Sequence, residues 1–168
     1  MNKLLYAVLS LFGLGGGDNA TSGITDGDWS ETTKVVYRFG DRSVVPDYHR
    51  SYTVSVSAKE ISISIDSYGT TLLERKYPNT AEAFLSFTNE LAKKEIKKHK
   101  EVEDNGCSGG TTQYLSLYKG DECYFSAYVY NCSGKSGTLT LPPGTAELIC
   151  RQLPENLDAL IHSTYENH

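Results

Sequence analysis

Two short segments of this chain alternate strictly between apolar and small polar residues. They are Tyr52–Ser57 (YTVSVS) and Ile61–Asp66 (ISISID). Since successive side chains of a β-strand point to opposite faces, this period predicts strands with one buried face and one face in water. The break between them is short enough for a tight connection, so we expect an antiparallel hairpin. The chain must therefore build a sheet and cover one side of it.

The hairpin is predicted to belong to a four-stranded meander that ends in a helix. Val35–Phe39 is the expected first strand, Tyr68-Gly69-Thr70 a turn, and Leu72–Tyr77 a further strand. Thr80 fits a helix N-cap, and Lys93–Lys98 suits the negative end of a helix dipole. Between them, apolar residues recur at helical spacing: Phe84, Leu85, Phe87, Leu91 and Ile96.

The second half of the chain repeats this plan. We expect strands at Tyr114–Tyr118, Cys123–Tyr130 and Thr138–Leu141, then a helix interrupted at Pro154. The string Pro143-Gly144-Thr145-Ala146-Glu147 matches Pro78-Asn79-Thr80-Ala81-Glu82 in the first half. The sequence therefore predicts the α+β class, with two antiparallel β-meander-plus-helix units, about 34–100 and 107–163, arising by internal duplication.

A single domain over 34–168 accommodates both units, because a chain of 168 residues suits one core. Lys3 followed by the apolar stretch Leu4–Leu14 has the form of a signal peptide, so residues 1–20 are expected to be a signal peptide or an N-terminal apolar segment. The stretch is too short for a stable membrane span, which needs about 20 apolar residues. Residues 21–33 are polar and aperiodic, which predicts a linker.

The four cysteines favour disulfides, since an even count in a short exported chain is typical of them. If the turn centres on Gly120-Asp121, Cys132 lies opposite residue 109, so a Cys107–Cys132 bridge is expected. Cys123 and Cys150 either pair with each other or remain buried thiols, and the bridge is slightly favoured.

Charge and spacing argue against several functions. A formal net charge of -5 argues against nucleic-acid binding. The histidines and cysteines have no metal-ligand spacing, so no metal or cofactor is expected. Gly106–Gly110 matches G-x-S-x-G, but it stands before an expected strand, whereas a nucleophile elbow opens a helix. We interpret it as a turn beside the disulfide.

The best candidate site is a polar cluster on the long loop after the first strand and on the turn that faces it. Its members have side chains suited to binding, namely Arg38, Tyr48, His49, Arg50, Asp66 and Tyr68. The simpler interpretation is a set of hydrogen bonds that hold the loop in place.

Five segments resemble a group of small bacterial proteins of unknown function, over roughly residues 35–163. They are Tyr37–Asp41, Pro46–Tyr52, Asp66–Gly69, Cys107–Gly110 and Tyr130–Cys132. The resemblance implies a bacterial source and an exported domain, and it implies no activity.

These observations favour a non-enzymatic extracytoplasmic binding module, periplasmic or secreted, that recognises another protein or a small ligand. An inhibitor of a hydrolase would be one form of it. The alternatives are a cytoplasmic location and a small hydrolase that uses His49 with Asp47 or Asp66. The hydrolase hypothesis requires His49 to lie within hydrogen-bond reach of a carboxylate.

Overall fold

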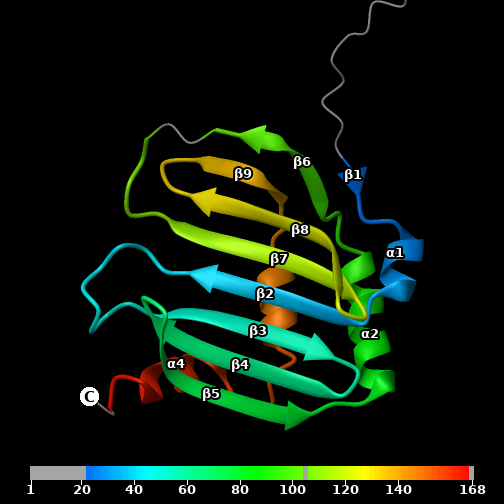
Figure 1. Cartoon of the computed structure of the whole chain (residues 1–168), viewed down its shortest axis with the longest axis horizontal. Coiled ribbons are helices and arrows are strands. Elements are labelled where there is room, and N and C mark those ends of the chain that lie inside the picture. The colour runs from blue at the N-terminus through cyan, green and yellow to red at the C-terminus, as the bar shows by residue number, and fades with distance from the viewer. Residues whose placement is uncertain (1–21, 104–105, 167–168) are drawn as a thin grey trace, which may run out of the picture.

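The computed structural model describes residues 22–103 and 106–166, which form one antiparallel sheet with helices on one face (Figure 1). The sheet order is β1-β6-β9-β8-β7-β2-β3-β4-β5. The strands are β1 (Ser22–Gly23), β2 (Lys34–Gly40), β3 (Ser51–Ser57), β4 (Glu60–Ser67), β5 (Thr70–Pro78), β6 (Lys97–Val102), β7 (Thr111–Lys119), β8 (Glu122–Asn131) and β9 (Lys135–Thr140). The helices are α1 (Asp26–Glu31), α2 (Ala81–Ala92), α3 (Thr145–Cys150) and α4 (Leu157–Ser163).

The hairpin expected from the alternating segments is confirmed. β3 and β4 pair antiparallel, with Val54 opposite Ile63. Both side chains are fully buried on the helix-covered face, whereas the serines between the apolar positions point to the other face. The next turn holds Tyr68 at φ 50° and Gly69 at φ 85°, and two positive φ angles suit the twist of a two-residue hairpin loop.

The two expected units share a single sheet rather than forming separate ones. β2 pairs with β3 on one side and with β7 on the other, both antiparallel. The common helix-entry string takes two different conformations. Thr80 is an N-cap whose hydroxyl accepts from the Ala83 N–H, whereas Thr145 lies inside α3 and donates to the Pro142 carbonyl. The internal duplication therefore stays a prediction.

The core lies between the sheet and the helices behind it (Figure 1). Leu91 of α2 and Ile149 of α3 are fully buried against it. The expected interruption near Pro154 is present, because α3 ends at Cys150 and α4 begins at Leu157 under an Asn156 cap. No helix of the described residues is long and apolar enough to cross a membrane.

The expectation of a linker over 21–33 is wrong, because β1 and α1 lie within this segment. The Thr25 hydroxyl accepts from the Asp28 N–H, and the Asp28 carboxylate accepts from the Thr25 N–H. This capping box starts α1, and Trp29 of α1 is 5% exposed in the core. The apolar segment expected over 1–20 lies outside the described residues.

The helix tail expected at Lys93–Lys98 is also wrong. α2 ends at Ala92, and Lys97–Val102 forms β6, which pairs with β9. Ile96 is 2% exposed and anchors the turn between helix and strand. The β9 backbone supplies the hydrogen bonds that a longer helix would have supplied, so pairing with a distant strand overrides the local preference.

The Cys107–Cys132 disulfide is confirmed, whereas the Cys123–Cys150 bridge is wrong. Leu117 faces Phe125, but Tyr118 faces Cys123, so a bulge inserts one extra residue into β8. The inserted residue reverses the alternation and turns Cys123 to the exposed face. Cys150 lies behind the sheet, so the two thiols are on opposite sides.

Candidate functional site

The candidate site surrounds the loop of residues 41–50, which joins β2 to β3 at one end of the sheet (Figure 1). Asp41 holds the two ends of this loop together. Its carboxylate accepts from the backbone N–H groups of Arg42 and Arg50, at 2.8 and 3.0 Å. Its own N–H donates to the Ser51 hydroxyl at 3.0 Å. Side-chain bonds therefore fix a segment that has no secondary structure of its own.

His49 is 5% exposed and packs under the β4–β5 turn. Its ring stacks on the Tyr68 ring with centroids 3.9 Å apart. The Tyr68 N–H donates to His49 Nδ1 at 3.2 Å, so the remaining ring proton of the neutral imidazole lies on Nε2, 3.4 Å from the Ser51 hydroxyl. The imidazole therefore ties the loop to the turn.

The geometry required by the hydrolase hypothesis is not present. Among the described residues, His49 forms no hydrogen bond to a carboxylate. Asp66 instead accepts from the Gly69 N–H at 2.9 Å and stabilises the turn. Ser108 lies in a loop between glycines with positive φ angles, and β7 follows it, so the local structure is not a nucleophile elbow.

Arg50 is 5% exposed and connects the loop to the end of α4, more than a hundred residues away in sequence. Its Nε donates to the Thr164 hydroxyl at 2.6 Å, and its Nη2 donates to the Thr164 carbonyl at 3.3 Å. Its Nη1 donates to the carbonyls of His49 and Pro46, at 2.7 and 3.3 Å. The Tyr165 ring lies over the guanidinium at 4.0 Å. All of these partners are neutral.

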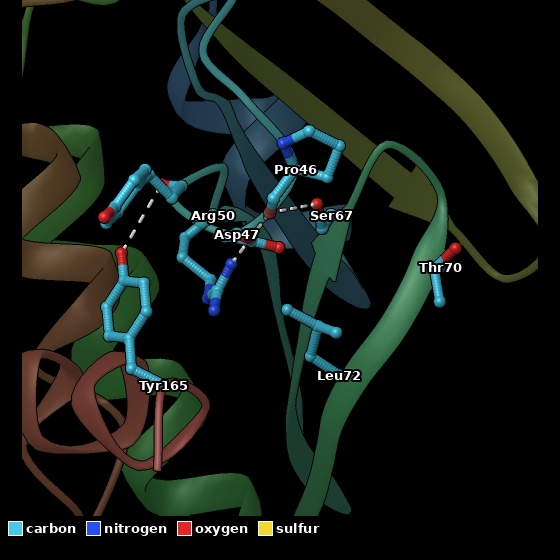
Figure 2. A pocket seen from close by; sticks show the side chains of 8 residues that line it. Pro46, Asp47, Arg50, Ser67, Thr70, Leu72 and Tyr165 are labelled. Atoms are coloured by element: carbon cyan, nitrogen blue, oxygen red, sulfur yellow. Dashed lines mark hydrogen bonds between the residues drawn. The ribbon is translucent and has the colours of Figure 1, made fainter. Parts of the chain in front are cut away.

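The structure divides the six predicted site residues between two sides of the loop. Arg38, His49, Asp66 and Tyr68 line a shallow groove of about 280 Å³ that opens onto the uncovered face of the sheet. Tyr48 and Arg50 line a second pocket, of about 560 Å³. Figure 2 shows this pocket, where Arg50 extends into the space between Tyr165 and Leu72.

The uncovered face carries two ordered rows of side chains across the central strands, and we call it the open face. The register aligns the first row as Ser62, Ser55, Val36, Ser116 and Ser126. It aligns the second as Ser64, Thr53, Arg38, Tyr114 and Tyr128. The described helices α2, α3 and α4 lie behind the sheet, and no described element covers the centre of its front (Figure 1).

The second row concentrates aromatic and cationic groups beside the groove. Tyr114 is 41% exposed, and its ring lies 5.8 Å from that of Tyr128. A hydrogen bond to Glu101 raises the pKa of the Tyr128 hydroxyl. Arg38 is exposed, and its side chain forms no hydrogen bond or ion pair with any described residue. Its guanidinium is therefore available to a partner.

Sequence reasoning missed several residues of these surfaces. Tyr114 and Tyr128 could have been found from the sequence. The period-2 alternation of their strands places them on the other face of the sheet from the buried Leu115 and Ala127. Thr164 and Tyr165 had no signal, since only the packing of α4 brings them to Arg50. No group of three or more His, Cys, Asp or Glu side chains in the described part of the chain is positioned to hold a metal ion.

Comparison of the chain with protein-family models, with curated proteins and with solved structures found no match.

Proposed function

We propose that the protein is a non-enzymatic interaction module that binds another protein on the open face of its sheet. The observation that carries the proposal is the row Arg38, Tyr114 and Tyr128 on three adjacent strands, next to the groove. Arg and Tyr are the side chains most often found at the energetic centres of protein interfaces. Arg38 has no partner within the described chain, so contact with another protein would give its guanidinium one.

The serine row supports the same proposal. Ser55, Ser62 and Ser116 are short, so they leave a flat area beside the taller tyrosines. Their hydroxyls can each donate and accept, and the Ser116 hydroxyl bonds to that of Ser126 at 3.2 Å. Tyrosine supplies large contact area at low entropic cost while serine supplies adaptable hydrogen bonds, a combination that binding surfaces use repeatedly.

An extracytoplasmic location is part of the proposal. The Cys107–Cys132 disulfide supports it, because disulfides persist in oxidising compartments and are rare in a reducing cytosol. Mass spectrometry of the protein from its native host tests this directly. Recovery with the disulfide oxidised and residues 1–20 removed is the expected result, and a reduced, unprocessed chain would contradict the location.

The binding face is tested with a double variant, Arg38→Ala with Tyr114→Ser. Both side chains are exposed, so the free energy of unfolding should not change. The native protein is used to capture partners from the extracytoplasmic fraction of its host, and each partner is then purified and titrated. We expect the double variant to weaken binding at least tenfold, since interface hot spots each contribute about 2 kcal/mol or more.

Arg75→Ala is the matched control. Arg75 is exposed on the edge strand β5 and lies opposite Ile63, on the helix side of the sheet. It should bind the partner as the native protein does. Equal affinity for the native protein and the double variant would reject the open face as the binding surface. A hydrolase among the captured partners, inhibited on binding, would specify the module as an inhibitor.

A further inference from the structure

We propose that the pocket beneath the loop, here called the Arg50 pocket, binds a monoanionic carboxylate that carries an apolar or aromatic group. The pocket has a volume of about 560 Å³ and lies between the loop, the β4–β5 hairpin and Tyr165 (Figure 2). It is a different site from the open face, so this inference does not depend on the proposed protein partner.

The pocket contains a buried positive charge that has no counter-ion among the described residues. Arg50 is 5% exposed, and no carboxylate of the described residues lies within 4.0 Å of its guanidinium. A guanidinium stays protonated in proteins and cannot escape burial by losing its charge. Arginines are almost never fully buried without a charged partner, because removing an unpaired charge from water is costly.

The neutral partners of Arg50 leave room for one more acceptor. The bonds to Thr164, His49 and Pro46 use Nε, both hydrogens of Nη1 and one of Nη2, which is four of the five N–H donors of an arginine. The remaining Nη2 hydrogen has no acceptor among the described residues. The Thr164 carbonyl at the end of α4 and the Tyr165 ring offset part of the charge. A carboxylate would supply a full countercharge and a charge-assisted hydrogen bond.

The rest of the pocket selects among anions. Tyr48, Leu72 and Tyr165 offer apolar and aromatic surface around Arg50. Asp47 also lines the pocket, so Arg50 is the one positive side chain against one negative side chain. The pocket lining therefore has one cation to pair with one carboxylate, and the second negative charge of a dianion such as phosphate would have no cation to pair with and would lie near Asp47. The combination favours a carboxylate attached to an apolar group over an inorganic anion.

Two sources could present this chemistry: a free organic acid, and the C-terminal carboxylate of a peptide that ends in an aromatic residue. Calorimetric titration of the full chain with 3-phenylpropanoate and with its neutral amide tests the shared chemistry. The acid should bind with a millimolar or lower Kd, and the amide at least tenfold more weakly. Binding should weaken as salt is added, because the attraction is partly electrostatic.

A second pair of titrations separates the sources. It uses a tetrapeptide ending in phenylalanine, once with a free carboxylate and once amidated. Tighter binding of the free-carboxylate peptide than of 3-phenylpropanoate would assign the ligand to a chain terminus. Tighter binding of the free acid would assign it to a small molecule. Either result supports the carboxylate site, provided that the matching amide binds more weakly.

Variants locate the binding in the Arg50 pocket. Arg50→Met removes the charge, but it also removes the bonds that hold the loop, so it can fail to fold. Thr70→Glu avoids this problem, because Thr70 is exposed and lines the pocket. The added negative charge should weaken binding of the acid at least fivefold. Thr71→Glu is the matched control, since Thr71 is exposed on the same strand and does not line the pocket.

Three results would overturn the proposal. The acid and its amide could bind equally, phosphate could bind more tightly than the acid, or Thr70→Glu and Thr71→Glu could have the same effect. The Arg38→Ala/Tyr114→Ser variant should bind the acid as the native protein does. Failure of the carboxylate site and failure of the open face are therefore distinguishable.

Discussion

The disulfide between Cys107 and Cys132 should contribute about 3.5 kcal/mol to the free energy of unfolding. The two cysteines are 25 residues apart in sequence. In the chain-entropy model, closing a loop of this length removes about 12 cal/mol/K from the entropy of the unfolded chain, which is about 3.5 kcal/mol at 25 °C. The perturbation that tests this is the double variant Cys107→Ser/Cys132→Ser.

The bridge stabilises the protein through its effect on the unfolded chain, because the native structure already brings the two cysteines together. The bridge lies just beyond the last pair of the β7–β8 hairpin, where Thr111 faces Asn131. The folded chain therefore holds these ends close with or without the covalent bond. The unfolded chain has no such hairpin, so only its entropy changes when the bridge is removed.

Urea unfolding followed by circular dichroism measures the effect. Both proteins should carry Cys123→Ser, because this exposed thiol could exchange with the bridge during unfolding. With a slope of about 2 kcal/mol/M, the midpoint should fall by about 1.8 M. Reductant should lower the midpoint of the bridged protein and leave the double variant unchanged. A loss of stability below about 1 kcal/mol would refute the reasoning from loop entropy.

Three further predictions concern the backbone, the half-buried Cys150 thiol and the N-terminal helix. Gly137→Ala should destabilise the protein by at least about 2 kcal/mol in urea unfolding, because φ is +104° at Gly137 and a Cβ would lie 2.5 Å from a carbonyl oxygen of β8. Gly134→Ala is the control, since a Cβ there would meet open space, and it should leave the stability unchanged. Burial raises the pKa of the Cys150 thiol to about 11 and also raises that of the Tyr52 hydroxyl. The unfolded chain loses these protons at lower pH than the folded chain does. The contribution of the two groups to the free energy of unfolding should therefore be fully present below about pH 9 and fall toward pH 11. Cys150→Ala should make that decline less steep, by up to about 1.4 kcal/mol per pH unit. Trp29→Ala should cost about 3–5 kcal/mol, and a change below 1 kcal/mol would contradict its place in the core.

Local patterns in the sequence were sufficient for the strands other than β1 and β6, and for one helix start. The alternation over Tyr52–Asp66 determines the β3–β4 hairpin, because a strand with one apolar face has a single way to bury it. Thr80 was recognised as an N-cap for the same kind of reason, since the cap involves only residues within one turn. The Thr25–Asp28 capping box was equally readable and was overlooked. These features depend on neighbours along the chain.

The candidate site could be predicted only in part. The chemistry of the loop and turn residues identifies them as candidates, but no local pattern divides them between the groove and the Arg50 pocket. Whether Arg50 is buried depends on Thr164 and Tyr165, which the packing of α4 brings to it. The open face was implicit in the alternation, yet it became a continuous surface only when β2 paired with β7.

The remaining features were decided by contacts between distant segments. The lysine-rich stretch Lys97–Val102 is a strand because β9 offers hydrogen bonds to its backbone, and nothing within the stretch itself requires this. One bulge opposite Leu117 turns Cys123 away from Cys150. Period and capping are set by neighbours within a few residues and can be read in order along the chain. Strand partners, bulges and the burial of a charge depend on which surfaces meet, and only the folded chain settles that.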